Sequence, residues 1–175
     1  MFQSKSYIEK RHGKDKANRT DYLTQLVQEY QVTTSQEARQ QILAHLANFA
    51  YDPINYNTLW DLYAVDLFLD ALNDSNLQEF GMGGLANICL AEPRHHEYIL
   101  SQPSFRHAIV QCLDTSCTVN TQLNAMTTLM QLITQDNYTA LLTAELEQYL
   151  KRIQSQKDKQ TSTMASLFLK DYYHH

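Results

Sequence analysis

Apolar side chains recur along most of this chain at the spacing of an α-helix. Between residues 105 and 113 they fall at i, i+3, i+4, i+7 and i+8, and residues 65–72 and 119–133 follow a similar rule. The chain has four glycines and three prolines, and it has almost no alternating β-branched runs of the kind that strands show. The pattern therefore predicts an all-α fold built from amphipathic helices.

One helical unit is repeated along the chain. The segment HLANFAYDP at 45–53 returns as GLANICLAEP at 84–93, and TTLMQLITQDN at 127–137 takes the corresponding place in a third copy. Leu46, Leu85 and Leu129 mark the copies, 39 and 44 residues apart. A short helix (54–62, 94–100 and 137–142) follows each long one, and a medium helix (64–72 and 105–113) precedes the next. Three helices per unit match the helical repeats of about 40 to 47 residues.

Local signals predict where these helices begin and end. Thr34 with Glu37, and Ser75 with Gln78, have the spacing of capping boxes and predict the starts of two long helices. Prolines that follow the first two long helices predict corners. Stacked repeats need capped ends, and single amphipathic helices near residues 22–30 and 164–172 supply them.

The repeated motifs resemble a known family. The runs LANFAYDPINYNTL, DLFLDAL, EFGMGGLANIC and TTLMQLI are similar to the armadillo-repeat family, and most of all to its small members. The resemblance spans about residues 22–171. It implies a short right-handed armadillo-repeat superhelix, an α-solenoid with helical end caps, without catalytic activity. It also implies a nuclear role in pre-mRNA splicing assemblies. We expect a basic disordered tail over residues 1–20 and a single armadillo-repeat domain over 21–173, with about three full repeats plus caps.

The charge of the chain is divided into three blocks. Residues 1–20 carry a net +4, residues 21–150 a net −12 and residues 151–175 a net +3. The acidic body would repel a phosphate backbone and attract a basic or arginine-rich protein segment. The alternative, that these acids only keep a repeat protein soluble, stays open.

Composition also indicates in which cell compartment the protein is expected. No run reaches the eighteen or so apolar residues of a membrane helix, so we expect no membrane partner. The N-terminus lacks the apolar core and cleavage site of a secretory signal. The chain has three cysteines, Cys89, Cys112 and Cys117. An odd number without C-x-x-C spacing favours reduced thiols over disulfides or a zinc site. These features predict a location in the nucleus and/or the cytoplasm.

Recurring amides mark the candidate binding residues. Asparagine is a mediocre helix former, so its return at Asn48 and Asn87 indicates a use for its side chain. The resemblance implies that these amides line a concave groove and hold the backbone of a partner segment. Gln131 takes the matching place in the third unit. The same face is predicted to add Gln41, Glu79 and Asn124. In the alternative interpretation, the amides tie each long helix to the next loop.

Other motifs contain residue types that can act in catalysis or in ligand and metal binding. Gly81, Gly83 and Gly84 lie inside a predicted long helix, where close approach of a neighbouring helix would explain them. The run GMGG lacks the spacing, preceding strand and lysine of a phosphate loop. Three residue pairs remain as candidates. Asp66 and Asp70 fit the solvated face of a helix, and His95 and His96 lack the further ligands that a metal needs. His107 and Cys112 lie on one helix but do not face each other. We therefore expect no enzyme, cofactor or metal.

Two functional hypotheses follow from these patterns. In the first, the chain is a non-catalytic scaffold or adaptor that binds a basic segment of a partner protein in the acidic, Asn-lined groove. In the second, it is a structural subunit of a ribonucleoprotein complex, held by its convex or end surfaces. RNA would then contact only the basic tail, which contains Lys5, Lys10, Arg11, Lys14, Lys16 and Arg19. Either way we expect a monomer or a subunit of a hetero-complex.

Overall fold

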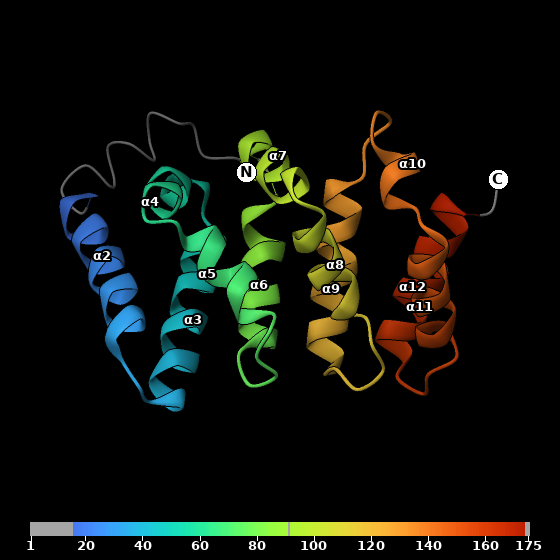
Figure 1. The fold of residues 1–175 in the computed structure, drawn as a ribbon, viewed down its shortest axis with the longest axis horizontal. Coiled ribbons are helices and arrows are strands. Elements are labelled where there is room, and N and C mark those ends of the chain that lie inside the picture. Colours follow the sequence, from blue (N-terminus) through green and yellow to red (C-terminus); the bar gives the residue numbers. More distant parts are fainter. Residues whose placement is uncertain (1–15, 91, 174–175) are drawn as a thin grey trace, which may run out of the picture.

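The computed structural model describes residues 16–90 and 92–173, and every regular element within them is a helix (Figure 1). The all-α prediction is therefore confirmed. The elements, in chain order, are α2 (Lys16–Val32), α3 (Gln36–Ala50), η1 (Pro53–Asn55), α4 (Tyr56–Asp61), α5 (Ala64–Ala71), α6 (Gln78–Ile88), α7 (Pro93–Ser101), α8 (Pro103–Gln111), α9 (Val119–Leu132), α10 (Tyr138–Leu141), α11 (Ala144–Gln154) and α12 (Lys159–Tyr172).

The long helices pack against one another in a row and form a solenoid. α3 packs against α6, α6 against α9 and α9 against α12, and Figure 1 shows the first three standing side by side. Between successive long helices run a short helix and a medium one: α4 with α5, α7 with α8, and α10 with α11. None of the helices in the described part of the chain combines the length and the apolar character needed to cross a bilayer.

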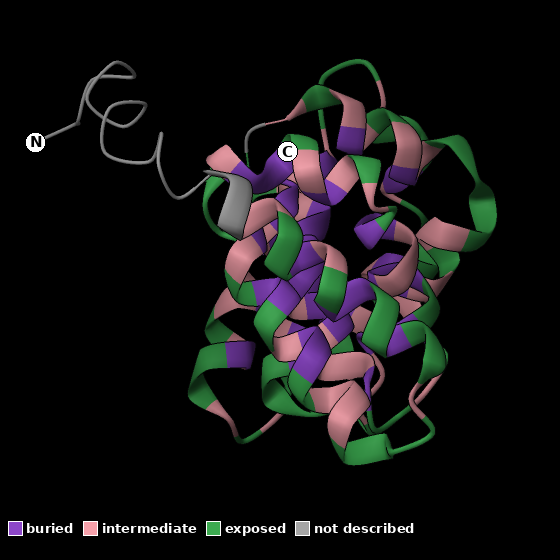
Figure 2. Cartoon of the chain, turned by 90° about the vertical axis from the view of Figure 1, so that its left-hand side faces the viewer, coloured by how far each residue is buried: buried purple, intermediate pink, exposed green. Residues whose placement is uncertain are grey.

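The core follows the repeat period. Leu46, Leu85 and Leu129 are buried in α3, α6 and α9, and Phe168 is buried in α12. Purple, buried segments run through the interior in the end-on view of Figure 2, whereas green, exposed segments lie on the outside. Burying one leucine or phenylalanine contributes about 1.5–3 kcal/mol. Because one helix unit cannot cover such side chains alone, neighbouring units are held together by them.

Polar contacts set the register between neighbouring units. The Gln36 side chain donates to Asp74 at 3.2 Å, and the Gln40 side chain donates to the Asn76 carbonyl at 3.0 Å. One unit later, the Glu79 carboxylate accepts from the Thr118 hydroxyl at 2.6 Å. In each case the first turns of a long helix contact the turn that leads into the next one.

The glycines of α6 serve two different purposes. A Cβ on Gly81 would lie 2.7 Å from the Phe68 carbonyl oxygen, and one on Gly84 would lie 2.4 Å from the Phe68 ring. The predicted close approach of a neighbouring backbone is thus confirmed at Gly81, whereas at Gly84 the neighbour is a side chain. At Gly83 a Cβ would meet only Asn124 Nδ2, at 3.5 Å. The close-approach explanation is therefore wrong for Gly83.

Three predicted boundaries are corrected. α3 is capped by Ser35, whose hydroxyl accepts from the Ala38 N–H, so the predicted Thr34 cap is off by one residue. α6 begins after Leu77 without a side-chain cap, because Asp74 instead folds the preceding turn by accepting from the Asn76 N–H. α2 begins at Lys16, inside the range predicted as a disordered tail. Residues 1–15 of that tail lie outside the described residues.

Candidate functional site

A shallow groove crosses three of the long helices. It has a volume of about 320 Å³. Its walls come from α3, α6 and α9, and the lining residues are Ala44, Ala47, Asn48, Glu79, Phe80, Gly83, Asn87, Asn120 and Asn124. The structure therefore brings together four of the residues predicted from the sequence: Asn48, Glu79, Asn87 and Asn124.

Two of these amides make no hydrogen bond with a described residue. Asn48 is exposed on α3, and its side chain makes no hydrogen bond with any described residue. Asn124 on α9 is half-buried over Gly83, and its side-chain amide likewise has no partner among the described residues. Each amide offers both donors and an acceptor. The two side chains can therefore pair with the N–H and C=O groups of an incoming backbone.

Asn87 has a structural role as well. Its Nδ2 donates to the Ala47 carbonyl at 2.9 Å, and its own backbone carbonyl accepts from the Tyr56 hydroxyl at 3.0 Å. The Ala47 carbonyl belongs to the last turn of α3, whose carbonyls lack partners within the helix. Asn87 therefore joins two units through the preceding long helix, whereas the alternative interpretation expected a bond to the next loop, and its Oδ1 makes no hydrogen bond with a described residue.

Glu79 is the only acidic residue among the groove's lining residues. Its Oε2 accepts from the Thr118 hydroxyl at 2.6 Å and its Oε1 accepts from Asn120 Nδ2 at 2.9 Å. These bonds hold the carboxylate at the start of α9, where the helix dipole favours negative charge. The groove is consequently lined mainly by amides, with one fixed carboxylate at its edge.

Two predicted residues lie outside this groove. Gln41 is exposed on α3, one turn before Ala44, and does not line the hollow. Gln131 is half-buried near the end of α9, and its Oε1 is shielded from solvent without a hydrogen-bond partner. Sequence reasoning missed Asn120, although its i, i+4 spacing from Asn124 on one helix was a usable signal.

Small residues, and not large aromatic ones, lie one helical turn before the repeated asparagines. Ala44 and Gly83 precede the two repeated asparagines by four residues, and both line the groove. The groove therefore has no row of large aromatic rings that could hold lysine stems. Phe80 is its one aromatic residue.

Comparison with known proteins identifies the family. No protein-family model matches the sequence. The chain is 40% identical over 158 residues to armadillo repeat-containing protein 7 of Mus musculus, which covers 88% of this chain and 78% of the relative. This chain belongs to the armadillo-repeat family. The resemblance seen in its repeated motifs, which is strongest to this small member, is thereby confirmed.

Solved structures show the armadillo fold independently. An engineered protein solved by the Northeast Structural Genomics Consortium superposes with a TM-score of 0.72 at 21% identity, over 86% of this chain and 62% of that one. A designed armadillo repeat protein gives a TM-score of 0.71 at 19% identity, over 85% of this chain and 63% of that one. The chain thus spans a little under two thirds of each structure. Armadillo-repeat proteins are generally non-catalytic scaffolds that bind other proteins.

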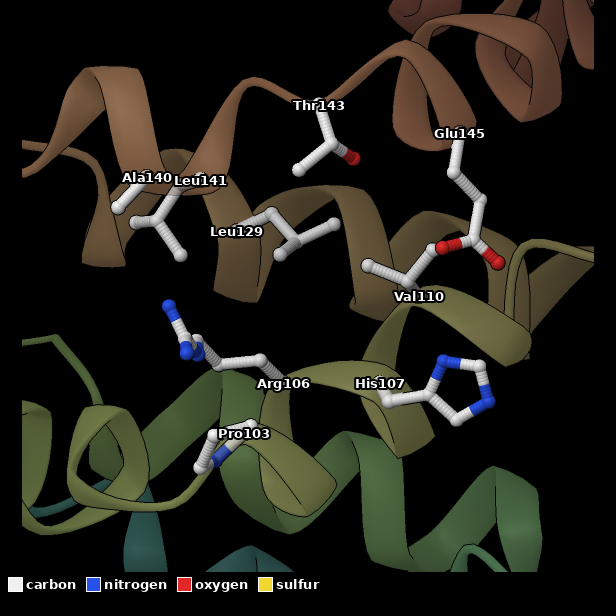
Figure 3. Close-up of a pocket in the computed structure, with 9 residues that line it drawn as sticks. All are labelled: Pro103, Arg106, His107, Val110, Leu129, Ala140, Leu141, Thr143 and Glu145. Carbon is white, nitrogen blue, oxygen red and sulfur yellow. The ribbon is translucent and has the colours of Figure 1, made fainter.

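A second hollow in the armadillo domain lies between α8 and the α10–α11 corner (Figure 3). Arg106 extends into it toward Leu141, while the His107 ring points away from Arg106. Neither His107 nor Arg106 forms a hydrogen bond or ion pair with a described residue. Cys112 is buried. The structure therefore brings together no thiol–imidazole pair here.

The other candidates for chemistry hold the armadillo fold together. His95 is buried, its Nδ1–H donates to the Ile88 carbonyl at 3.2 Å, and burial lowers its pKa. His96 Nε2 lies 2.5 Å from the Cys89 carbonyl. Both histidines thus contact carbonyls at the end of α6. Burial also raises the pKa of the Cys89 and Cys112 thiols to about 12. In the described part of the chain, no three His, Cys, Asp or Glu side chains are grouped closely enough to hold a metal ion.

Proposed function

We propose that this armadillo-repeat protein is a scaffold that holds an extended segment of a partner protein across α3, α6 and α9. One observation carries the proposal: the unbonded side-chain amides of Asn48 and Asn124 line the same groove, at its two outer helices. A backbone laid across them would find both donors and acceptors. The Asn87 Oδ1 between them adds a further acceptor.

The proposed partner segment is basic or arginine-rich. Residues 21–150 carry a net charge of −12. Two ion pairs join described residues, Glu92 with Arg94 and Glu147 with Lys151, apart from any contact of Arg19. The rest of this negative charge is therefore available to attract a positive segment and to increase its association rate.

Photo-crosslinking would test the groove directly. A photoreactive amino acid at Ala44, inside the groove, should crosslink a partner in cells, whereas the same group at Val32, which is exposed at the end of α2, should not. The double variant Asn48→Ala/Asn124→Ala should lose that crosslink and Asn73→Ala should keep it, because Asn73 bonds only within its own turn. An undiminished crosslink in the double variant would contradict groove binding.

We also propose a nuclear location and membership of a pre-mRNA splicing assembly. The support is the family resemblance and the 40% identity to armadillo repeat-containing protein 7, together with reduced cysteines. Imaging the tagged chain and isolating its complexes from nuclear and cytoplasmic fractions would test this. Recovery in the cytoplasm alone, without splicing factors, would contradict it.

The basic tail supports a second candidate function. Six basic and two acidic side chains within residues 1–20 favour contact with RNA, in a ribonucleoprotein complex that grips the solenoid by its convex or end surfaces. RNA binding should fall steeply as salt rises and should disappear when residues 1–20 are deleted. Groove binding should survive that deletion. RNA binding that persists without the tail would contradict this function.

A further inference from the structure

A third hollow, which shares no residue with the groove, lies where the α4–α5 corner meets α7. It is lined by Trp60, Tyr63, Val65, Asp66 and Tyr98. Its volume of about 90 Å³ exceeds the roughly 10–15 Å³ needed to admit one water-sized group. Three aromatic rings and one carboxylate around a small hollow form an environment suited to an organic cation.

Two of the three rings pack against each other. Trp60 and Tyr98 meet edge to face, with ring centroids 5.6 Å apart and an interplanar angle of 81°. The guanidinium of Arg94 lies 5.1 Å from the Trp60 ring centroid, although Arg94 does not line the hollow. The Trp60 ring therefore already interacts with one cation of the protein. Arg94 would repel a second cation, but Glu92, 3.7 Å from its Nε, offsets that charge.

Asp66 supplies a negative charge that nothing in the described structure neutralises. It is half-buried and accepts a hydrogen bond from the Tyr98 hydroxyl, so its assignment to a solvated helix face is wrong. It forms no ion pair with a described residue. The hydrogen bond to Asp66, followed by burial and the charges of Asp66 and Asp70, raises the pKa of Tyr98 to about 12. A half-buried carboxylate of this kind is stabilised when a cation binds beside it.

Tyr63 occupies a backbone conformation that its side chain does not favour. Its φ of 55° and ψ of 33° are left-handed, at the corner after α4 where glycine or asparagine is usual. A bulky residue there costs on the order of 1 kcal/mol. The side chain is 72% exposed, so burial returns little of that cost. Strain retained for an exposed ring at the rim of a hollow indicates a binding role.

We propose that Trp60, Tyr63 and Tyr98, together with Asp66, form an aromatic cage that binds a methylated lysine side chain of a partner protein. Methylation follows from the number of hydrogen-bond acceptors around the hollow. An unmethylated ammonium carries three N–H donors, whereas the one carboxylate among the lining residues has its Oδ1 bonded to the Tyr98 hydroxyl and only its Oδ2 left without a partner. Methyl groups replace such donors and place apolar surface against the rings, while the positive charge that the rings and Asp66 attract is kept.

Trp60 is the only tryptophan of the chain, so its fluorescence reports on this site. The full chain would be titrated with short neutral peptides whose single lysine carries zero to three methyl groups. A further peptide would replace the trimethylated nitrogen by a neutral quaternary carbon. Two methyl groups should strengthen binding by about fivefold, and the neutral peptide should bind about tenfold more weakly than the trimethylated one. Equal binding of charged and neutral peptides, tightest binding of the unmethylated one, or no saturable signal would overturn the proposal.

Matched variants test whether the peptide binds at the cage. Asp66→Asn should weaken binding of the dimethylated peptide by about tenfold, and Asp70→Asn, one helical turn away and exposed, by less than about twofold. Tyr63→Gly suits the left-handed backbone and removes one wall, so it should weaken binding with an unchanged or higher melting temperature. Equal losses for the two aspartate variants, or full binding by Tyr63→Gly, would overturn the cage.

This site is separate from the groove. The groove variant Asn48→Ala/Asn124→Ala should bind the dimethylated peptide as tightly as the unaltered chain does, because none of the cage residues lines the groove. A groove variant that lost peptide binding would contradict a cage at Trp60.

Discussion

The side-chain amide of Asn87 donates a hydrogen bond to the backbone carbonyl of Ala47, 2.9 Å away in the neighbouring unit. Asn48, which holds the same place one unit earlier, makes no such bond with any described residue. Two asparagines that are equivalent in sequence therefore have different roles. One holds the stack of helices together, and the other is available to a ligand.

The different roles of Asn87 and Asn48 should appear in the free energy of unfolding. Asn87→Ala should lower the free energy of unfolding by about 1–2 kcal/mol, because it leaves the carbonyl of the buried Ala47 without this partner. Asn48→Ala should change it by less than about 0.5 kcal/mol. Urea unfolding followed by circular dichroism would compare them. Equal losses in the two variants would mean that the inter-unit bond does not form.

The glycines of α6 should respond in opposite directions to alanine. Gly83→Ala should stabilise the chain by up to about 1 kcal/mol, since its methyl group makes an ordinary contact with Asn124 and alanine favours a helix. Gly81→Ala and Gly84→Ala should each cost about 1–3 kcal/mol, because Phe68 would have to move. Thermal unfolding of the three variants would show the order. A destabilised Gly83→Ala with the other two unaffected would contradict the packing described here.

The left-handed corner offers a stability test that needs no ligand. Tyr63→Asn should leave the free energy of unfolding unchanged or raise it by about 1 kcal/mol, since asparagine tolerates φ near 55° and the tyrosine ring is mostly exposed. Tyr63→Val should lower it, because a β-branched side chain fits this region worst. Chemical denaturation distinguishes these outcomes. A higher stability for valine than for asparagine would rule out a left-handed residue here.

Acid should destabilise the chain through His95. Burial lowers the folded-state pKa of His95 from its ordinary value of 6.5, so the unfolded chain binds a proton more readily than the folded one. Stability is therefore lost as pH falls below about 6.5, and it is fully present above that value. Urea unfolding at pH 5.5 and 7.5 would measure the loss. His95→Leu should flatten this dependence and His107→Gln, at an exposed position, should retain it. An unchanged slope in His95→Leu would place the effect elsewhere.

Thiol reactivity reports on packing. Burial raises the pKa of the Cys89 and Cys112 thiols to about 12, and it raises the pKa of the half-buried Cys117. In the native protein at pH 8, iodoacetamide should modify Cys117 first and reach the other two only after unfolding. Mass spectrometry of a time course would follow each site. Early alkylation of Cys89 would contradict a closed core at the end of α6.

The order and periodicity of the helices were determined by the sequence itself. An amphipathic stripe is a local property, so the spacing of Phe105 to Leu113 predicted α8, and the period from Leu46 to Leu85 predicted the stacking of α3 on α6. Recurrence also predicted part of the groove. A repeated unit places equivalent residues along one wall, which brought Asn48 and Asn87 together with Glu79 and Asn124.

Only the tertiary structure decided which polar groups stay free. A hydrogen bond such as that from Asn87 to Ala47 joins residues forty positions apart, so it depends on how closely two units stack. The same holds for Glu79, whose two oxygens are taken by residues of the next unit, and for Gln131, whose Oε1 is shielded although its helical position matches that of Asn87. The cage around Trp60 arises likewise from α4, α5 and α7 meeting in space. Local periodicity determines where a helix forms, whereas the contacts between units determine which of its side chains a partner can reach.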